Sequence, residues 1–179
     1  MVLNLQIPDN LRLDKPFIEL LNVGKTFENG SKQNRRQVLN QVSFRVYRGE
    51  TVVVLGRSGV GKSVLLKLIM GFLVPDSGKI FVDGQEITGS SEEEMLLIRR
   101  KVTMVFQSGA LFDSLTASDN IAFPLREKRT LCEEEIERRV GMLLKQVDMM
   151  DIASKMPSDL STGMKRAVSI ARAIASEPE

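Results

Sequence analysis

The sequence predicts an α/β fold with an antiparallel β part near its N-terminal end and a mostly helical second half. Three observations support this prediction. Apolar and polar residues alternate from 42 to 46, which indicates a half-buried strand, and a β-branched apolar run at 51–55 indicates a strand buried on both faces. Apolar residues recur at helical spacing over 133–147. The chain has 179 residues, which suits one domain, with or without a small additional lobe.

The composition is that of a globular protein, with 42% apolar and 27% charged residues. No segment approaches the roughly 20 uncharged apolar residues of a membrane span. The 25 basic and 23 acidic residues leave a net charge of +2, so no nucleic-acid partner is expected. The single cysteine, Cys132, excludes an internal disulfide, and the absence of histidine excludes histidine-based catalysis.

The first half of the chain is expected to begin with an irregular arm over residues 1–16. Strands are predicted at 17–21 and around 42–46, and the polar stretch 28–37 between them is predicted to be a loop. The basic side chains of this loop either contact phosphate or lipid headgroups or simply face solvent; they are Lys32, Arg35 and Arg36.

The run at 51–55 is predicted to be the central strand of a parallel sheet. A helix after it is expected to end at Pro75 and to bury one apolar face, made of Leu65, Leu68, Ile69 and Phe72. The Asp83-Gly84 dipeptide predicts a hairpin over 79–87. The second half is expected to contain a helix at 92–100, a short strand at 102–106, a helix at 133–147 and a last helix capped by Ser161.

Residues 56–63 match the phosphate-binding pattern G-x-x-x-x-G-K-[ST] in full, between a predicted strand and a predicted helix. Glycines let the backbone wrap around an anion, and consecutive amides with a helix N-terminus supply donors and positive potential. Lys62 is expected to reach the β- and γ-phosphates, and the Ser63 hydroxyl is expected to bind Mg²⁺. The matching residues are Gly56, Arg57, Ser58, Gly59, Val60, Gly61, Lys62 and Ser63.

The chain also contains other elements in a characteristic order. Phe27 precedes the phosphate loop, Gln107 follows an apolar run, and Leu160-Ser161-Thr162-Gly163-Met164 opens a helix. In this order the sequence resembles the nucleotide-binding domain of an ABC transporter ATPase, from about residue 17 to residue 179. Residues 106–126 and Met164 resemble the lipid-trafficking Mla type within that family. The resemblance implies a P-loop NTPase core of the RecA-like class, with an antiparallel β part and a helical insertion at about 108–160.

The resemblance also implies roles for individual residues. Phe27 would stack on the adenine ring, or it is only an aromatic residue of the core or of a loop edge. Gln107 would sense the γ-phosphate through Mg²⁺ or the attacking water, and the backbone at Val64 would contact the α-phosphate. Ser161 and Gly163 would contact the nucleotide of a second copy of the chain. Ser161 also fits a simple helix cap, and both roles can coexist.

The partners implied by the resemblance are a second ATP-binding subunit, forming a homodimer, and an integral-membrane permease. The permease would contact 107–126, where Leu111, Phe112, Leu115 and Phe123 are either docking contacts or internal packing. The protein would bind ATP and Mg²⁺, lie on the cytoplasmic face of the inner or plasma membrane, and energise lipid or phospholipid transport. Two alternatives stay open, namely a non-hydrolytic nucleotide-binding remnant and a soluble ABC protein without a transport role.

The sequence departs from the family pattern at three places. Val64 stands where the family usually has Thr, and Thr162 replaces the first signature glycine. The Walker B Asp and Glu and the switch histidine do not occur in the 179 residues. For the isolated chain we therefore expect weak ATP binding, negligible hydrolysis and aggregation, with the segments 51–55 and 102–106 lacking partner strands.

Overall fold

The computed structural model describes residues 15–28 and 35–179. The chain divides into two units, an N-terminal unit that ends at Arg99 and a C-terminal unit from Arg100 to Glu179. The predicted α/β class is confirmed. In chain order, the strands and α-helices are β1 (Ile18–Glu28), β2 (Arg35–Val46), α1 (Lys62–Ile69), β3 (Ser77–Val82), β4 (Gln85–Glu86), α2 (Glu92–Lys101), α3 (Ala117–Lys128), α4 (Glu133–Gln146) and α5 (Thr162–Ala175).

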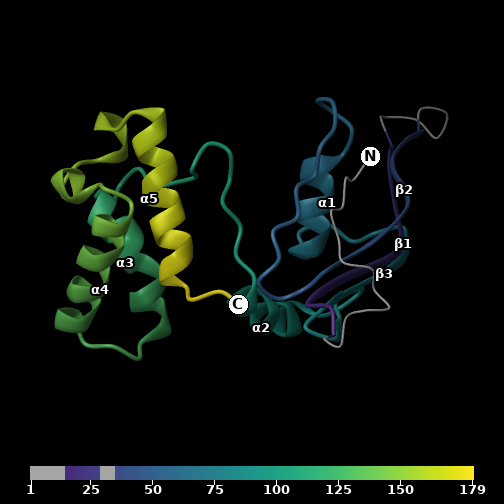
Figure 1. The fold of residues 1–179 in the computed structure, drawn as a ribbon, viewed down its shortest axis with the longest axis horizontal. Coiled ribbons are helices and arrows are strands. Elements are labelled where there is room, and N and C mark those ends of the chain that lie inside the picture. Colours follow the sequence, from purple (N-terminus) through teal and green to yellow (C-terminus); the bar gives the residue numbers. More distant parts are fainter. Residues whose placement is uncertain (1–14, 29–34) are drawn as a thin grey trace. The chain divides into compact units, whose positions relative to one another are not determined.

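The N-terminal unit contains an antiparallel sheet with the strand order β2-β1-β3-β4 (Figure 1). Ile18 in β1 pairs with Val46 in β2 on one side and with Val82 in β3 on the other. The buried side chains of this sheet come mostly from the two central strands, with Leu20, Val23, Ile80 and Val82, and Leu39 adds one from β2. The antiparallel β part is therefore present as predicted, and in β3 the buried Ile80 and Val82 alternate with the more exposed Lys79 and Phe81.

The first two strands are longer than the sequence predicted. Residues 28–37 were expected to form a loop, but β1 continues to Glu28 and β2 begins at Arg35. Phe27 pairs with Arg36, and Glu28 pairs with Arg35 and forms an ion pair with it at 2.7 Å. The loop prediction was wrong at both ends because cross-strand pairing overrides the polar character of these residues. Lys32 lies outside the described residues.

The hairpin between β3 and β4 is confirmed, and its turn explains why Asp83-Gly84 predicts it. Asp83 has φ +51° and Gly84 has φ +76°, so both residues adopt the left-handed conformation. Two left-handed residues define the type I′ turn, whose twist matches that of the flanking strands. The turn therefore fixes the register in which Val82 pairs with Gln85.

The segments 51–55 and 102–106 do not form strands, so the prediction of a parallel central strand was wrong for the described residues. The side chains of Val53 and Leu55 are 54% and 53% exposed. A β-branched run is stable as a strand only when neighbouring strands satisfy its backbone and cover its side chains. The described residues pair no strand with either segment, so neither run has the backbone partners that a strand requires.

Helix α1 ends earlier than predicted, at Ile69 rather than near Pro75. The amide of Phe72 donates to the Lys67 carbonyl at 2.9 Å, and the amide of Gly71 donates to the Leu68 carbonyl at 3.1 Å. These two bonds form a Schellman motif, with Gly71 at φ +66° as its left-handed residue. Phe72 consequently lies beyond the helix and is 46% exposed, so its predicted burial was wrong, whereas Leu65, Leu68 and Ile69 are buried.

The C-terminal unit is a small helical bundle in which α3, α4 and α5 pack against one another (Figure 1). The helices predicted at 133–147 and after Ser161 are confirmed, whereas α3 was not predicted as a separate element. Among the described helices, none has the length and apolar character needed to cross a membrane. The core side chains come from all three helices and include Ile121, Leu125, Ile136, Val140, Leu144, Val168 and Ala171.

Candidate functional site

The predicted phosphate-binding loop, residues 56–63, lies in the N-terminal unit and leads directly into α1. Gly59 has φ +78°, and Gly61, the residue that caps α1, has φ +102°. A Cβ atom at Gly61 would lie 2.7 Å from Cγ1 of Val38 and 3.2 Å from the carbonyl oxygen of Val38. Only glycine permits this backbone conformation together with so close an approach to β2. The pattern of glycines thus has a local structural cause.

The backbone amides of the loop are free to bind an anion. Within the described residues, none of the amides from Gly59 to Val64 donates to a backbone carbonyl or a side chain. The first amides of a helix have no partner within it, and they carry the positive end of its dipole. A concentration of unpaired donors at a helix N-terminus suits phosphate, so the residues present fit this group.

Lys62 and Ser63 supply the side-chain groups of the loop. The Lys62 ammonium donates to the carbonyl oxygens of Gly56 at 2.8 Å and Arg57 at 2.9 Å, which holds it over the loop. No carboxylate in the described residues forms an ion pair with it, so its charge stays available for an anion. Ser63 is exposed and Val64 is half-buried in α1. The other predicted loop residues, Arg57, Ser58 and Val60, are exposed.

Phe27 lies in the same unit as the loop and is linked to it through β2. Its cross-strand partner is Arg36, and paired residues project from the same face of a sheet. The Arg36 guanidinium donates to the carbonyl oxygen of Gly59 at 3.2 Å. The half-buried Phe27 ring also has the Lys25 ammonium 5.7 Å from its centre. Arg36 is thus a loop contact that the sequence analysis did not assign, and only its charge could have indicated it.

The remaining predicted site residues, Gln107, Ser161 and Gly163, lie in the C-terminal unit. Gln107 is exposed in a turn closed by a 2.9 Å hydrogen bond from the Gly109 amide to the Phe106 carbonyl. Ser161 caps α5, and its hydroxyl accepts from the Met164 amide at 3.3 Å. Gly163 is exposed in the first turn of the same helix. The predicted site residues are therefore divided between the two units.

Replacing Ser161 by alanine tests its capping role. We expect the free energy of unfolding of the C-terminal unit to fall by about 1 kcal/mol, because the Met164 amide loses its acceptor. Urea denaturation followed by circular dichroism measures this change. Ser158→Ala, at an exposed residue three positions earlier, should change stability by less than about 0.5 kcal/mol. Equal effects of the two substitutions would contradict the capping role.

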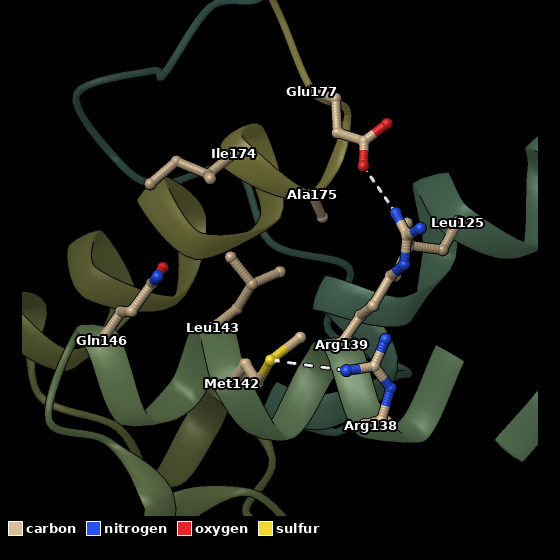
Figure 2. Close-up of a pocket in the computed structure, with 9 residues that line it drawn as sticks. All are labelled: Leu125, Arg138, Arg139, Met142, Leu143, Gln146, Ile174, Ala175 and Glu177. Carbon is tan, nitrogen blue, oxygen red and sulfur yellow. Dashed lines mark hydrogen bonds and ion pairs between the residues drawn. The ribbon is translucent and has the colours of Figure 1, made fainter. Parts of the chain in front are cut away.

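A cavity of about 380 Å³ lies between α3, α4 and α5 (Figure 2). Leu125, Leu143 and Ile174 contribute to its apolar wall, and the guanidinium of Arg139 points to Glu177 at 2.5 Å. Arg138 and Arg139 both donate to Glu135 and hold the pKa of that carboxyl at about 2. Because carboxylates already neutralise both arginines, the cavity has no free cation for a nucleotide, and it contains none of the predicted site residues.

Comparison with known proteins identifies the family. The family model for ABC transporters matches residues 39–179. An intermembrane phospholipid transport system ATP-binding protein, MlaF of Haemophilus influenzae, is 41% identical over 167 residues, which are 93% of this chain and 61% of that protein. MlaF of Escherichia coli is 41% identical over 147 residues, 82% of this chain and 55% of that protein. The chain thus spans little more than half the length of these relatives.

Other matches point to the same family. The methionine import ATP-binding protein MetN of Brucella abortus is 40% identical over 163 residues, 91% of this chain and 42% of that protein. The ATP-binding cassette MJ0796, solved as a dimer in a post-hydrolysis state bound to ADP and phosphate, superposes with a TM-score of 0.83 at 33% identity. That match covers 90% of this chain and 70% of the solved one. Because the family model covers residues 39–179 and the relatives match most of the chain, this chain belongs to the ABC transporter family.

Proposed function

We propose that this chain binds Mg²⁺-ATP at residues 56–64 and is the ATP-binding subunit of an ABC system that transports phospholipid. The unpaired amides from Gly59 to Val64, beside the unneutralised Lys62 ammonium, are the observation that supports nucleotide binding. The names of the two MlaF relatives support the phospholipid substrate, as does the likeness of residues 106–126 and Met164 to the Mla type.

The residues of the loop have separate tasks in this proposal. Lys62 exchanges its bonds to the Gly56 and Arg57 carbonyls for bonds to the β- and γ-phosphates, and the free amides surround the phosphate oxygens. The family resemblance assigns Mg²⁺ to the Ser63 hydroxyl and to the Gln107 amide oxygen, each of which would offer an oxygen ligand of the kind that Mg²⁺ prefers. The metal supplies neutralisation of phosphate charge. Gln107 also orients the attacking water, since an amide can accept and donate at once.

The base of the nucleotide would lie on Phe27. Its ring shares a sheet face with Arg36, which contacts the loop at Gly59, so an adenine ring attached to phosphates in the loop has an aromatic partner within the same unit. The Val64 amide would contact the α-phosphate, without the additional hydroxyl that Thr would offer there. We infer that the affinity for ATP is modestly lower as a result.

The nucleotide would be closed off by a second copy of the chain, in a homodimer. Ser161 and Gly163, at the positive N-terminal end of α5, would contact the γ-phosphate held by the partner's loop. In this proposal residues 17–179 form the nucleotide-binding domain, with residues 108–160 as a helical insertion, and most of the arm expected at 1–16 lies outside the described residues. ATP binding would close the dimer, and hydrolysis would open it.

A permease would dock on the helical insertion and place the protein on the cytoplasmic face of the membrane. Phe112 and Phe123 are 43% and 40% exposed, and their ring centres lie 4.7 Å apart beside a cavity of about 320 Å³. Leu111, by contrast, packs against the helical core, and Leu115 is half-buried. We therefore assign docking to the two phenylalanines and internal packing to the two leucines.

A substitution at Gly163 tests the dimer. A Cβ atom there would meet only the Ser161 hydroxyl, at 3.9 Å, so the single chain leaves room for a side chain to begin at this position. In the soluble fraction that remains after aggregates are removed, we expect Mg²⁺-ATP to produce dimers of the unaltered chain in sedimentation velocity, and the Gly163→Leu variant to bind ATP but stay monomeric. A leucine side chain would occupy the space that the partner's phosphates need.

Gly141→Leu is the matched control for this test. Gly141 is also a helical glycine of the C-terminal unit, in α4, and a Cβ atom there would meet nothing within 4 Å. This variant should dimerise as the unaltered chain does. The dimer proposal would be wrong if Gly163→Leu associated normally, or if the unaltered chain bound Mg²⁺-ATP without associating.

A further inference from the structure

A buried asparagine forms hydrogen bonds that hold the segment after Gln107 against the helical bundle. Asn120, in α3, has no exposed surface. Its side-chain oxygen accepts from the Phe112 amide at 2.8 Å, and its side-chain nitrogen donates to the carbonyls of Phe112, Leu115 and Thr116 at 3.0 to 3.1 Å. The later part of the segment is thereby held against the start of α3.

Helix α5 forms a second set of hydrogen bonds with the segment after Gln107. The Arg172 guanidinium donates to the carbonyl oxygens of Gly109 at 3.0 Å and Ala110 at 2.8 Å, and more weakly to Asn120 at 3.4 Å. It also lies 5.5 Å from the centre of the Phe112 ring. Burial lowers the pKa of Arg172, so the carbonyls replace part of the water that this cation loses. Arg172 thus binds the backbone of the turn at Gly109 and Ala110, two and three residues after Gln107.

The turn also touches the beginning of α5. A Cβ atom at Gly109 would lie 3.1 Å from the carbonyl oxygen of Lys165, in the first turns of the helix. Gly109 has φ +83° and Ala110 has φ +44°, so two successive residues hold the left-handed conformation where Arg172 binds their carbonyls. For an alanine this conformation is unfavourable, and external contacts must maintain it.

We propose that Arg172 is a positioning residue that ties the turn carrying Gln107 to α5. Because Ser161 caps this same helix, about three helical turns before Arg172, a displacement of α5 moves Gln107 and Ser161 together. Gln107, the proposed γ-phosphate sensor, and Ser161, the proposed contact to the partner's nucleotide, then move together. This inference deepens the proposed function and rests on it for the roles of Gln107 and Ser161.

The test compares ATP binding with and without metal, by calorimetry on the full chain. Arg172→Met removes the guanidinium and keeps an apolar stem. We expect it to reduce the gain in ATP affinity that Mg²⁺ provides by about threefold to tenfold, the size of one or two net hydrogen bonds. In EDTA, the ATP affinity of Arg172→Met should stay within about twofold of that of the unaltered chain, because the substitution does not change the phosphate loop. A loss of the same size in EDTA would overturn the proposal.

Arg166→Met is the matched control, at the other arginine of the first three turns of α5. The exposed Arg166 side chain makes no hydrogen bond or ion pair with the described residues. This variant should bind ATP as the unaltered chain does, with and without Mg²⁺. An effect equal to that of Arg172→Met would contradict a role specific to Arg172.

A double-mutant cycle with Gln107→Ala separates positioning from general stability. If Arg172 acts through Gln107, Arg172→Met should have almost no further effect on Mg²⁺-dependent affinity in the Gln107→Ala background. A full additional loss would overturn the proposal. Arg172→Lys, whose ammonium can still donate to the carbonyl of Gly109 or Ala110, should restore most of the affinity lost in Arg172→Met.

Hydrogen exchange decides the structural part of the inference without nucleotide. In Arg172→Met, the amides of residues 109–115 should exchange about tenfold faster or more, and Arg172→Lys should slow them again. Unchanged exchange would overturn the inference whether or not ATP binds. A failure of the unaltered chain to bind ATP would instead refute the proposed function, and the exchange result would still show whether Arg172 fixes the turn.

Discussion

Replacing Lys62 by alanine is expected to weaken ATP binding by about 10-fold to 100-fold. The Lys62 ammonium is held against the loop carbonyls of Gly56 and Arg57, and a hydrogen bond to a charged group contributes about 1.5–3 kcal/mol. Its present partners, the carbonyls of Gly56 and Arg57, belong to exposed residues that water can solvate. The fold should therefore survive the change. Titration with a fluorescent ATP analogue measures the loss.

Lys67→Ala controls for the general loss of positive charge. Lys67 lies in the last turn of α1, is exposed, and stands at the end of the helix away from the free amides. Its removal should change ATP affinity by less than about twofold, because exposed charges act weakly across water. Equal affinities of the Lys62→Ala and Lys67→Ala variants would contradict the assignment of residues 56–64 as the nucleotide site.

Replacing Asn120 by alanine is expected to lower the free energy of unfolding of the C-terminal unit by about 3 kcal/mol. The change removes the bonds donated to the Phe112, Leu115 and Thr116 carbonyls and the bonds accepted from the Phe112 amide and from Arg172. It leaves partly buried backbone groups near Phe112 and Leu115 without partners, at about 1–3 kcal/mol each. Water that enters the space left by the Asn120 side chain would satisfy some of these groups, so the expected loss of stability is smaller than the sum of the separate costs. Urea denaturation followed by circular dichroism measures the change.

The control for this prediction is Glu127→Ala in the same helix. Glu127 is exposed, and in the described residues its side chain makes no hydrogen bond or ion pair. Alanine there should change stability by less than about 0.5 kcal/mol. A loss at Asn120 no larger than the loss at Glu127 would show that the network around Phe112 does not stabilise the unit.

Elements with a strong local cause were predictable from the sequence. The Asp83-Gly84 turn, the cap at Ser161 and the helix of residues 133–146 each depend on residues within a few positions of one another. The phosphate loop is of the same kind, because its glycines and Lys62 are contiguous in the chain. Its position before α1 agrees with the expectation, whereas the nucleotide-binding roles of its residues stay predictions.

Elements that depend on distant partners were predicted poorly. The run at 51–55 has the composition of a buried strand, yet no other strand pairs with it among the described residues, and Val53 and Leu55 are exposed. Residues 35–37 have the composition of a loop, yet pairing with β1 makes them a strand. Phe72 fits the periodicity of α1, but the Schellman motif at Gly71 ends the helix before it.

The sequence alone determined the family and the positions of the groups that can bind phosphate, because these depend on residue types in a short contiguous pattern. Only the tertiary structure decided that Arg36 contacts the loop at Gly59, and that Asn120 and Arg172 hold the segment after Gln107. These contacts join residues separated by up to 63 positions. No local periodicity encodes them, because a side chain finds such carbonyls only after the helices and strands have packed.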